Sequence, residues 1–209
     1  MHCPKAFEEN TPATLLALIR QYPLATVISH ADTGLEVNLL PMLLQQCDGQ
    51  SYLLGHMAKN NAQLQALAHS KEVVWVFQGP NAYVSPAWYP SKQTHGKVVP
   101  TWNYIMIEVR GKVRLFEDED ALLHVVTALT QEHECEREQP WQVSDAPSAY
   151  VAGQLRGIVG IEVTIESMHG KFKLSQNRSE ADQAGVVAGI ASAQAEHAIL
   201  AWMPTCEHE

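Results

Sequence analysis

The feature that most constrains the fold is a series of short aliphatic segments that end at turn signals. Strand-like runs cover residues 24–29, 35–45 and 51–57. Asp32-Thr33-Gly34 and Asp48-Gly49 separate these runs, and such residues readily adopt the positive φ angles of hairpin turns. Short strands joined by tight turns pair in the antiparallel sense. The first third of the chain is therefore predicted to form an antiparallel meander.

Further strand-like segments continue this pattern along the chain. Residues 71–78 and 81–88 flank Gly79-Pro80, which predicts two strands joined by a turn. Residues 103–116 alternate, are interrupted at Gly111 and then resume. This interruption indicates either one long strand with a bulge or a hairpin.

With a last strand over residues 158–175, the sequence predicts about six or seven strands. Helical patterns flank them at residues 10–23, 58–70, 117–134 and 178–203. The expected caps are Asn10 or Thr11, Asn60 or Asn61, and Ser179. Gly185 and Gly189 weaken the middle of the last helix.

These elements predict a mainly β (α+β) fold, a small antiparallel barrel with flanking helices. Neither repeats nor a clear linker interrupt the chain, so residues 1–209 are expected to form a single domain with a helical C-terminal segment at about 179–203. A sheet of this kind must close or have its edges covered. Pairing with a second copy would do this, so a homodimer is expected.

Composition narrows the classes of function. The net charge of −9 argues against a broad non-specific nucleic-acid surface. The longest apolar run is too short for a membrane helix, and the polar start "MHCPKAFEENTP" does not resemble a signal peptide, so a cytoplasmic location is expected. The four cysteines are scattered, which is typical of reduced thiols.

The positive charge is concentrated in two short windows. Five cations stand between Ser85 and Leu115 against one acid, and three more stand between Ser167 and Ser179 with no acid. The first window contains "SPAWYPSKQTHGKVVPTWNY", in which prolines 86, 90 and 100 restrict the backbone beside Trp and Tyr rings. Held aromatic faces next to cations suit a flat, negatively charged ligand. A packed loop with solvated lysines is the alternative.

Two further stretches could receive an anion. In "LLGHMAKNN" (53–61) a strand ends at Gly55-His56 and a helix follows, so free helix N–H groups would stand near His56 and Lys59. In "GKFKLSQNRSEAD" (170–182), Lys171 and Lys173 alternate on one strand face before a capped helix. An ordinary strand–helix corner and a solvated turn are the respective alternatives.

Other chemistries lack their patterns. "HECE" (133–136) and "CEHE" (206–209) contain metal-ligand types without the paired spacing of a zinc site. The sequence contains no nucleophile elbow, no Walker loop and no dinucleotide fingerprint. Accordingly, neither a metal site nor a set of catalytic residues is predicted.

The strings "GHMAKNNAQ", "YVSPAWYPSK", "VPTWNY" and "GKFKLSQNRSEADQAGV", in this order, closely resemble the PaiB-type FMN-binding negative transcriptional regulators of bacteria. The resemblance runs along nearly the whole chain. It implies the flavin-binding split barrel shared with pyridoxamine-phosphate oxidase-like proteins, a homodimer with FMN in its interface. One departure is Leu39, which stands where the family usually has His in a His-Leu-Pro string.

The resemblance also implies a set of FMN contacts, one group from each string. They are His56, Met57, Lys59 and Asn60; Ser85, Pro86, Thr101, Trp102 and Asn103; and Lys173, Gln176 and Arg178. The last group is expected to reach the site across the dimer.

The function implied by the resemblance is an FMN-binding negative regulator of transcription. Because the chain is acidic and shows no helix-turn-helix, indirect regulation is at least as well supported as direct DNA binding. A flavin-dependent oxidoreductase of the split-barrel type is the alternative, in which the protein holds and tunes the ring. A haem-handling relative on the same barrel is a third reading.

Overall fold

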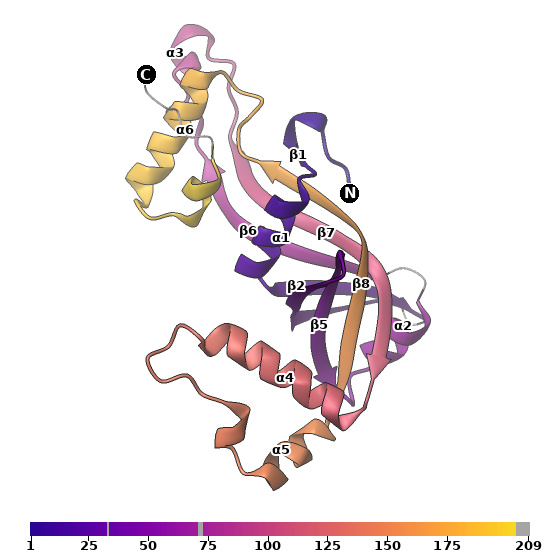
Figure 1. The fold of residues 1–209 in the computed structure, drawn as a ribbon. Helices are drawn as coiled ribbons and strands as arrows, with labels where there is room; N and C mark the ends of the chain where they lie inside the picture. Colours follow the sequence, from indigo (N-terminus) through magenta and orange to yellow (C-terminus); the bar gives the residue numbers. More distant parts are fainter. Residues whose placement is uncertain (33, 71–72, 204–209) are drawn as a thin grey trace. The chain divides into compact units, whose positions relative to one another are not determined.

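The computed structural model describes residues 1–32, 34–70 and 73–203. The chain divides into two compact units (Figure 1). The larger unit comprises Leu16–Phe77 and Glu108–Met168, and the smaller unit comprises Met1–Leu15, Gln78–Ile107 and His169–Glu209. The strands that belong to both units are β6 (Val73–Val84), β7 (Thr101–Phe116) and β8 (Ile158–Lys173).

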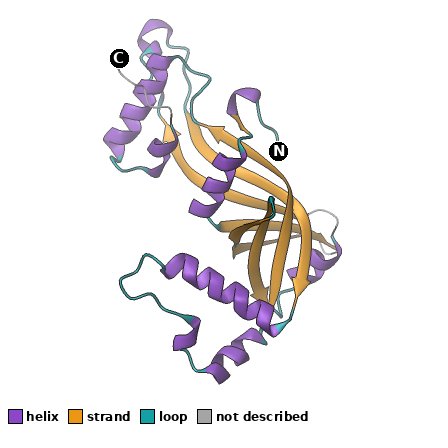
Figure 2. Ribbon diagram, viewed as in Figure 1, coloured by secondary structure: helices purple, strands orange, loops and turns teal. Residues whose placement is uncertain are grey.

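The larger unit is an antiparallel sheet with flanking helices (Figure 2). Its own strands are β2 (Leu24–Ala31), β3 (Gly34–Pro41), β4 (Leu43–Cys47) and β5 (Gln50–Ala58). Together with the long strands they follow the order β3-β2-β6-β7-β8-β5-β4. The pairs β2–β3, β2–β6, β4–β5 and β5–β8 are antiparallel. The predicted antiparallel sheet with flanking helices is thus confirmed.

Two hairpins in this sheet follow from the turn residues. Asp48 and Gly49 have φ angles of 50° and 78°, which the two-residue turn between β4 and β5 requires. Ala31 pairs with Gly34 at the end of the β2–β3 hairpin. Thr33, which belongs to that predicted turn, lies outside the described residues.

The prediction of one strand over residues 35–45 is wrong, because the chain forms β3 and β4 with a break at Met42. Met42, Leu43 and Leu44 are all buried, and three buried residues in succession do not fit the strict alternation of one strand. The Met42 N–H donates to the Pro23 carbonyl at 2.9 Å. The interruption lets β3 pair with β2 while β4 pairs with β5.

The predicted turn at Gly79-Pro80 is also wrong, because β6 continues through it as one strand. The ladder between β2 and β6 ends at the pair Ala25↔Phe77. Beyond that pair the missing N–H of Pro80 interrupts no bond to β2, so proline is tolerated in the strand. The predicted strand over 81–88 ends early, at Val84, and is followed by a short 3-10 helix, η2 (Pro86–Trp88). Of the predicted strand over 71–78, residues 71 and 72 lie outside the described residues.

Of the two readings for residues 103–116, the long strand is the one observed, as β7. Gly111 does not end it. A Cβ atom at Gly111 would lie 2.0 Å from the Thr164 carbonyl oxygen, so glycine permits the close approach of the neighbouring β8 backbone.

Helices α2 (Gln63–His69), α4 (Glu119–Glu134) and α5 (Ser148–Leu155) belong to the larger unit, as does the 3-10 helix η3 (Val143–Asp145). Asp118 caps α4 by accepting a bond from the Ala121 N–H. Val125 and Leu129 of α4 form a buried cluster with Leu43 and Leu54 of the sheet. The amphipathic helix predicted over 117–134 is confirmed, whereas α5 was not predicted.

Gln63, the first residue of α2, connects this helix to the sheet. Its side chain is fully buried and donates to the Val27 carbonyl, the Ser29 hydroxyl and the Glu36 carbonyl at 3.0–3.2 Å. Its amide oxygen accepts from Asn38 at 2.7 Å. The Gln63 N–H donates to the Asn61 side chain, but Ala62 occupies the N-cap of α2, so the predicted cap at Asn60 or Asn61 is wrong.

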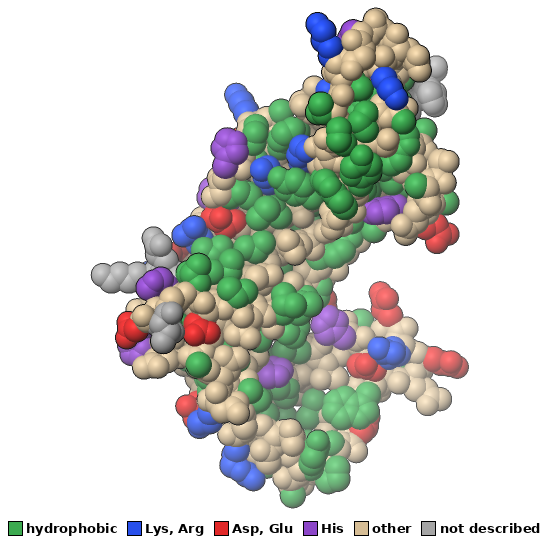
Figure 3. Space-filling view, turned by 180° about the vertical axis from the view of Figure 1, so that it is seen from behind, with side chains coloured by type: hydrophobic (Ala, Val, Ile, Leu, Met, Phe, Trp, Pro, Cys, Tyr) green, Lys and Arg blue, Asp and Glu red, His purple; other side chains and the backbone are tan. Residues whose placement is uncertain are grey.

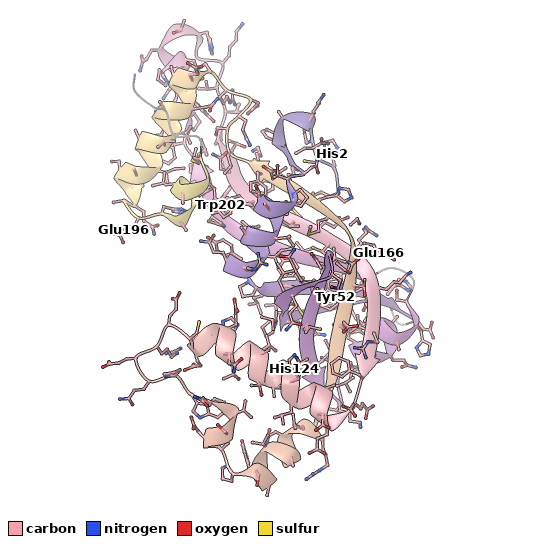
Figure 4. The ribbon with its side chains drawn as sticks, in the orientation of Figure 1. His2, Tyr52, His124, Glu166, Glu196 and Trp202 are labelled. Atoms are coloured by element: carbon pink, nitrogen blue, oxygen red, sulfur yellow. The ribbon has the colours of Figure 1, made fainter. Side chains whose placement is uncertain are left out.

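The smaller unit contains the remaining parts of the long strands. Strand β1 (Glu8–Glu9) pairs with the end of β8, and the helices are η1 (Lys5–Phe7), η2, α3 (Ser91–His95), α6 (Glu180–Ala193) and η4 (Ala198–Trp202). Helix α1 (Pro12–Gln21) begins in this unit and ends in the larger one. On the sheet, Phe172 packs edge-on against Trp202, labelled in Figure 4, with ring centroids 5.7 Å apart.

The helix predicted over 178–203 is partly wrong, because α6 ends at Ala193 and η4 follows separately. Ser179 caps α6 as predicted. The glycines in α6 have a packing reason. A Cβ atom at Gly185 would lie 2.1 Å from the Trp88 carbonyl oxygen, and one at Gly189 would lie 2.2 Å from the Trp88 ring. Trp88 therefore packs directly against the α6 backbone.

Candidate functional site

Two of the three predicted motif groups meet in the smaller unit. The Lys173 ammonium at the end of β8 donates to the Thr101 hydroxyl and, at 2.7 Å, to the Trp102 carbonyl at the start of β7. The neighbouring Asn103 is fully buried and exchanges hydrogen bonds with the Ser175 hydroxyl at 3.0 and 3.1 Å. Residues about seventy positions apart in the sequence are thus joined at one place.

Positive charge accumulates around Lys173. Its pKa is lowered, first by burial and then by the neighbouring cations Lys171 and Arg178. Within the described part of the chain, these three cations make no salt bridge to a carboxylate. A cation held among like charges is stabilised when an anion binds beside it. We refer to Lys171, Lys173 and Arg178 as the cationic cluster.

Aromatic rings accompany the cationic cluster. The Lys171 and Lys173 ammonium groups lie 5.4 and 6.0 Å from the centroid of the Tyr104 ring, and the Arg178 guanidinium lies 4.8 Å from that of Tyr89. Trp102 is 53% exposed and meets Tyr83 edge-on at 5.9 Å. The smaller unit therefore presents cations and open ring faces together, as a ligand with a flat ring and a negative charge requires.

The turn after β8 is held in an unusual conformation. Ser175 has a φ angle of 70°, in the left-handed region that non-glycine residues seldom adopt. The Gln176 side chain binds the turn's own backbone, accepting from the Leu174 N–H at 2.7 Å and donating to the Phe172 carbonyl. The Arg178 N–H donates to the Ser175 carbonyl. Gln176 thus shapes the turn that carries Arg178.

The predicted contacts Ser85 and Pro86 lie at the end of β6 in the same unit. The Ser85 hydroxyl accepts from the Ala87 N–H at 3.2 Å and so caps η2. Ser85 and Pro86 therefore directly follow β6, the strand that carries Tyr83, which contacts Trp102.

The first motif group lies in the larger unit, and the other eight predicted contacts lie in the smaller unit. Lys59 forms an ion pair with Glu117, and Asn60 is exposed. Met57 is buried among the apolar side chains of the sheet. His56 is half-buried, its Nδ1 atom has no hydrogen-bond partner among the described residues, and burial lowers the pKa of its imidazole.

The exposed position of Leu39 bears on the departure from the family pattern. Leu39 is on β3 in the larger unit and is 62% exposed, beside the similarly open Leu35 and Val37. Leu39 thus presents an aliphatic side chain on an open strand face rather than in the core.

Sequence reasoning missed some residues of the smaller-unit site. Tyr104 and Tyr89 provide the rings under the cations, and Asp182 accepts from the Ser91 N–H at 3.0 Å and from its hydroxyl at 2.8 Å. The last pair attaches the α3 segment to α6. The rings stand in the quoted aromatic stretch, but no sequence spacing links Ser91 to Asp182, ninety-one residues away.

Comparison with known proteins identifies the family. Residues 1–167 match the model of the family described as "Putative FMN-binding domain". The chain belongs to this family, the PaiB-type FMN-binding domain proteins. The Bacillus subtilis protease synthase and sporulation protein PAI 2 is 29% identical over 90% of this chain and 87% of its own length. An uncharacterized protein of Emericella nidulans is 35% identical over 91% and 90%.

Solved structures share the fold. The flavocytochrome Anf3 from Azotobacter vinelandii matches with a TM-score of 0.59 and 15% identity, over 88% of this chain and 78% of that protein. The FAD and heme binding protein from Mycobacterium smegmatis matches with a TM-score of 0.59 and 16% identity, over 85% and 78%. At these identities the comparison establishes the fold alone.

Two further observations concern other classes of site. Within the described residues, no group of three or more His, Cys, Asp or Glu side chains could hold a metal ion. None of the described helices combines the length and the apolar character needed to cross a membrane.

Proposed function

We propose that this protein binds FMN and that the smaller unit supplies the contacts to both phosphate and ring. The observation that carries the proposal is the cationic cluster, in which Lys173 has cations rather than carboxylates as its neighbours. The FMN phosphate would supply the missing negative charge, because charge-assisted bonds to phosphate are among the stronger polar contacts in proteins. Trp102 and Tyr83 would contact the isoalloxazine ring.

The residues have distinct roles in this proposal. Lys173 and Arg178 hold the phosphate, Thr101 and Trp102 place the Lys173 ammonium, and Asn103 and Gln176 fix the backbone of the adjoining turn. Ser85 and Pro86 form the start of η2, directly after the strand that carries Tyr83. When bound, FMN would supply redox chemistry, and the residues of this chain would bind and orient it.

The four residues of the larger unit remain FMN contacts by resemblance. Lys59 is the one of them with a charge suited to phosphate, and Glu117 already neutralises it. Its contribution to FMN binding would require exchange of that partner. We therefore give Lys59 a smaller part than Lys173.

A second copy of the chain fits the open face of β3. Leu35, Val37 and Leu39 point outward and are 71%, 57% and 62% exposed, while Glu36 and Asn38 lie on the more buried side. On an ordinary edge strand the exposed side chains are polar, whereas here they are apolar. Exposed apolar rows of this kind are typical of protein–protein interfaces. Sedimentation of the purified protein tests the homodimer, which Val37→Lys should dissociate and Tyr150→Lys, at another exposed site, should not.

The regulatory role rests on the relationship to PAI 2. The larger unit holds sixteen of the 23 acidic residues and eight of the fourteen basic residues, so the smaller unit is nearly neutral, and blue side chains are seen over both units in Figure 3. Because the proposed cofactor already uses the cationic cluster, we propose regulation through FMN or a partner molecule rather than through a broad DNA surface. Binding of DNA fragments that weakens steeply with salt, at the same protein concentration with FMN present, would contradict this.

The sharpest test compares FMN with riboflavin, which lacks the phosphate. Lys173→Met should weaken FMN by roughly 1.5–3 kcal/mol and riboflavin very little, because one charge-assisted bond is lost. Lys92→Met, an exposed lysine of the same unit, is the matched control. Isothermal titration measures both affinities. Equal weakening of the two flavins would remove Lys173 from the phosphate site.

A further inference from the structure

A groove lies in the larger unit between α4 and α5, two helices that lie side by side (Figure 1). Helix α4, the 3-10 helix η3 and helix α5 supply its walls. Its volume is about 800 Å³, and sites for small organic molecules usually measure ~300–1,000 Å³. None of the proposed FMN contacts lines this groove.

The groove is largely apolar because of the helical spacing of its lining residues. Glu119, Leu123 and Thr127 are four residues apart and therefore share one face of α4. Val151 and Leu155 have the same spacing on α5. The Leu123 side chain is 38% exposed, so the described chain leaves part of this apolar face open to water. An apolar molecule that entered the groove would remove that face from water.

The charge around the groove is strongly negative. Residues 117–156 include α4, η3 and α5, and they contain nine acidic residues against two basic ones. With histidine counted as neutral, this segment has a net charge of −7, whereas the whole chain has −9. A concave site whose surroundings have charge of one sign raises the local concentration of ions of the opposite sign. The groove therefore favours cations.

Glu119 places one of these carboxylates at the groove itself. Its side chain is exposed, and in the described part of the chain it forms no salt bridge. Its neighbours differ in this respect, because Glu117 pairs with Lys59 and Asp118 caps α4. A cation in the groove would thus meet a carboxylate that no cation of the described chain occupies.

We propose that this groove binds a lipophilic cation, a small molecule with an apolar body and one amine group. The apolar body lies against Leu123 of α4 and Val151 and Leu155 of α5, and the ammonium group pairs with the Glu119 carboxylate. The charge and the apolar walls together select this class, because an inorganic cation would leave the walls in contact with water and a neutral molecule would leave Glu119 without a partner.

Two other occupants fit the groove less well. A second copy of the chain that used the same surface would bring two segments of charge −7 together, since a two-fold interface pairs each surface with itself. A helix from a partner protein needs a longer groove, because the eight residues of α5 span only about 12 Å.

The test compares decylammonium, decanol and decanoate, which share one alkyl chain and differ in charge. The purified full-length protein should bind decylammonium about tenfold more tightly than decanol, and decanoate more weakly than either, because an ion pair at an apolar wall is only partly screened by water. Titration calorimetry at low ionic strength measures the three affinities. In Glu119→Gln most of the preference for decylammonium over decanol should disappear.

Asp120→Asn is the matched control for the charge. It removes a carboxylate from the same helical turn, but Asp120 does not line the groove, so most of the preference should remain. The apolar walls are tested by Leu123→Ser, which should weaken all three probes by similar factors. His124→Ser, at the neighbouring exposed position, should leave them unchanged (Figure 4).

Several results would overturn the proposal. They are no binding of any probe, equal affinity for decylammonium and decanol, and a preference that persists in Glu119→Gln or falls equally in Asp120→Asn. Sedimentation of Leu123→Ser provides a further check, because dissociation of an assembly would assign the groove to a second copy. Failure of FMN binding would leave the proposal intact, since the two sites share no residue.

Discussion

The two compact units hold their charged groups differently. In the larger unit several cations are paired with carboxylates: Arg114 binds Glu162 through two bonds of 2.8 Å, and Lys59 binds Glu117. In the smaller unit Lys171 and Lys173 lie near each other and near an aromatic ring. Paired surface charges contribute little to folding stability and attract ligands weakly, whereas cations without a carboxylate partner attract anions. The difference indicates that the smaller unit is the one adapted to an anionic ligand.

The units also differ in how they use buried polar groups. Gln63 is surrounded by four partners in the larger unit, and each partner belongs to the helix–sheet scaffold. In the smaller unit, the buried Asn103 and Ser175 hold a turn in the left-handed conformation beside Arg178. The first arrangement stabilises a fold, and the second positions a side chain.

The largest expected effect tests the scaffold role of the larger unit. Gln63→Ala should lower the free energy of unfolding by about 3 kcal/mol, because several buried polar groups lose their partner at once. Gln65→Ala, at an exposed position of the same helix, should change it by less than about 0.5 kcal/mol. Urea denaturation measures both. A near-neutral Gln63→Ala would show that water replaces the side chain.

The next largest effect on stability is expected from the bonds that attach α3 to α6 in the smaller unit. Asp182→Asn should cost about 2 kcal/mol at neutral pH, because Ser91 loses a charged acceptor. The pKa of Asp182 is lowered, by bonds from Ser91 and by the Arg178 and Ser179 neighbours, against the opposing effect of burial. The contribution is therefore present above the pKa of an unfolded aspartate and is lost as the pH falls through the folded pKa. Acid unfolding curves of the two proteins should converge at low pH; curves that stay parallel would contradict this.

A smaller effect concerns the pH dependence of FMN binding. The pKa of Lys173 is lowered in the free protein, and a bound phosphate would favour the charged ammonium. FMN affinity should therefore fall as the pH rises through the Lys173 pKa, by up to roughly 1.5 kcal/mol. Lys173→Met should remove that part of the dependence, as fluorescence titration at several pH values would measure. The same slope in both proteins would assign the titration to another group.

The smallest effect tests whether the larger unit takes part in FMN binding. Lys59→Met should change the free energy of unfolding by less than about 1 kcal/mol, since exposed ion pairs contribute little. It should reduce the preference for FMN over riboflavin less than Lys173→Met does, because Glu117 already neutralises Lys59. An equal or larger reduction would contradict the assignment of the phosphate to the smaller unit.

Local features of the fold could be predicted well from the sequence. The Asp48-Gly49 turn, the amphipathic α4 and the Ser179 cap depend on a few adjacent residues, and all are observed. The predictions that were wrong concern strand boundaries that depend on contacts with segments distant in the sequence. Pro80 ends no strand because its missing N–H faces no partner from β2, and Met42 divides a predicted strand because its neighbours are buried in succession.

For the candidate site, too, the sequence predicted the residue types but not their contacts. The motif strings identified the cations and rings as residue types, and the family membership is established. The spacing of the motifs in the sequence did not predict which of these residues come into contact. Lys173 bonds to Thr101, seventy-two residues away, and His56 lines a hollow beside α4. The resemblance groups His56 with the flavin contacts of the other strings.

The sequence by itself determined the chemistry available to this protein: where turns form, which helix is amphipathic, and that positive charge and aromatic rings occur in the same two windows. The tertiary structure decided which charges are compensated. Lys59 and Lys173 are alike in sequence, but one lies beside a carboxylate and the other beside cations. The physical reason is that electrostatic energy depends on distance and burial, which are set by contacts between segments far apart in the chain.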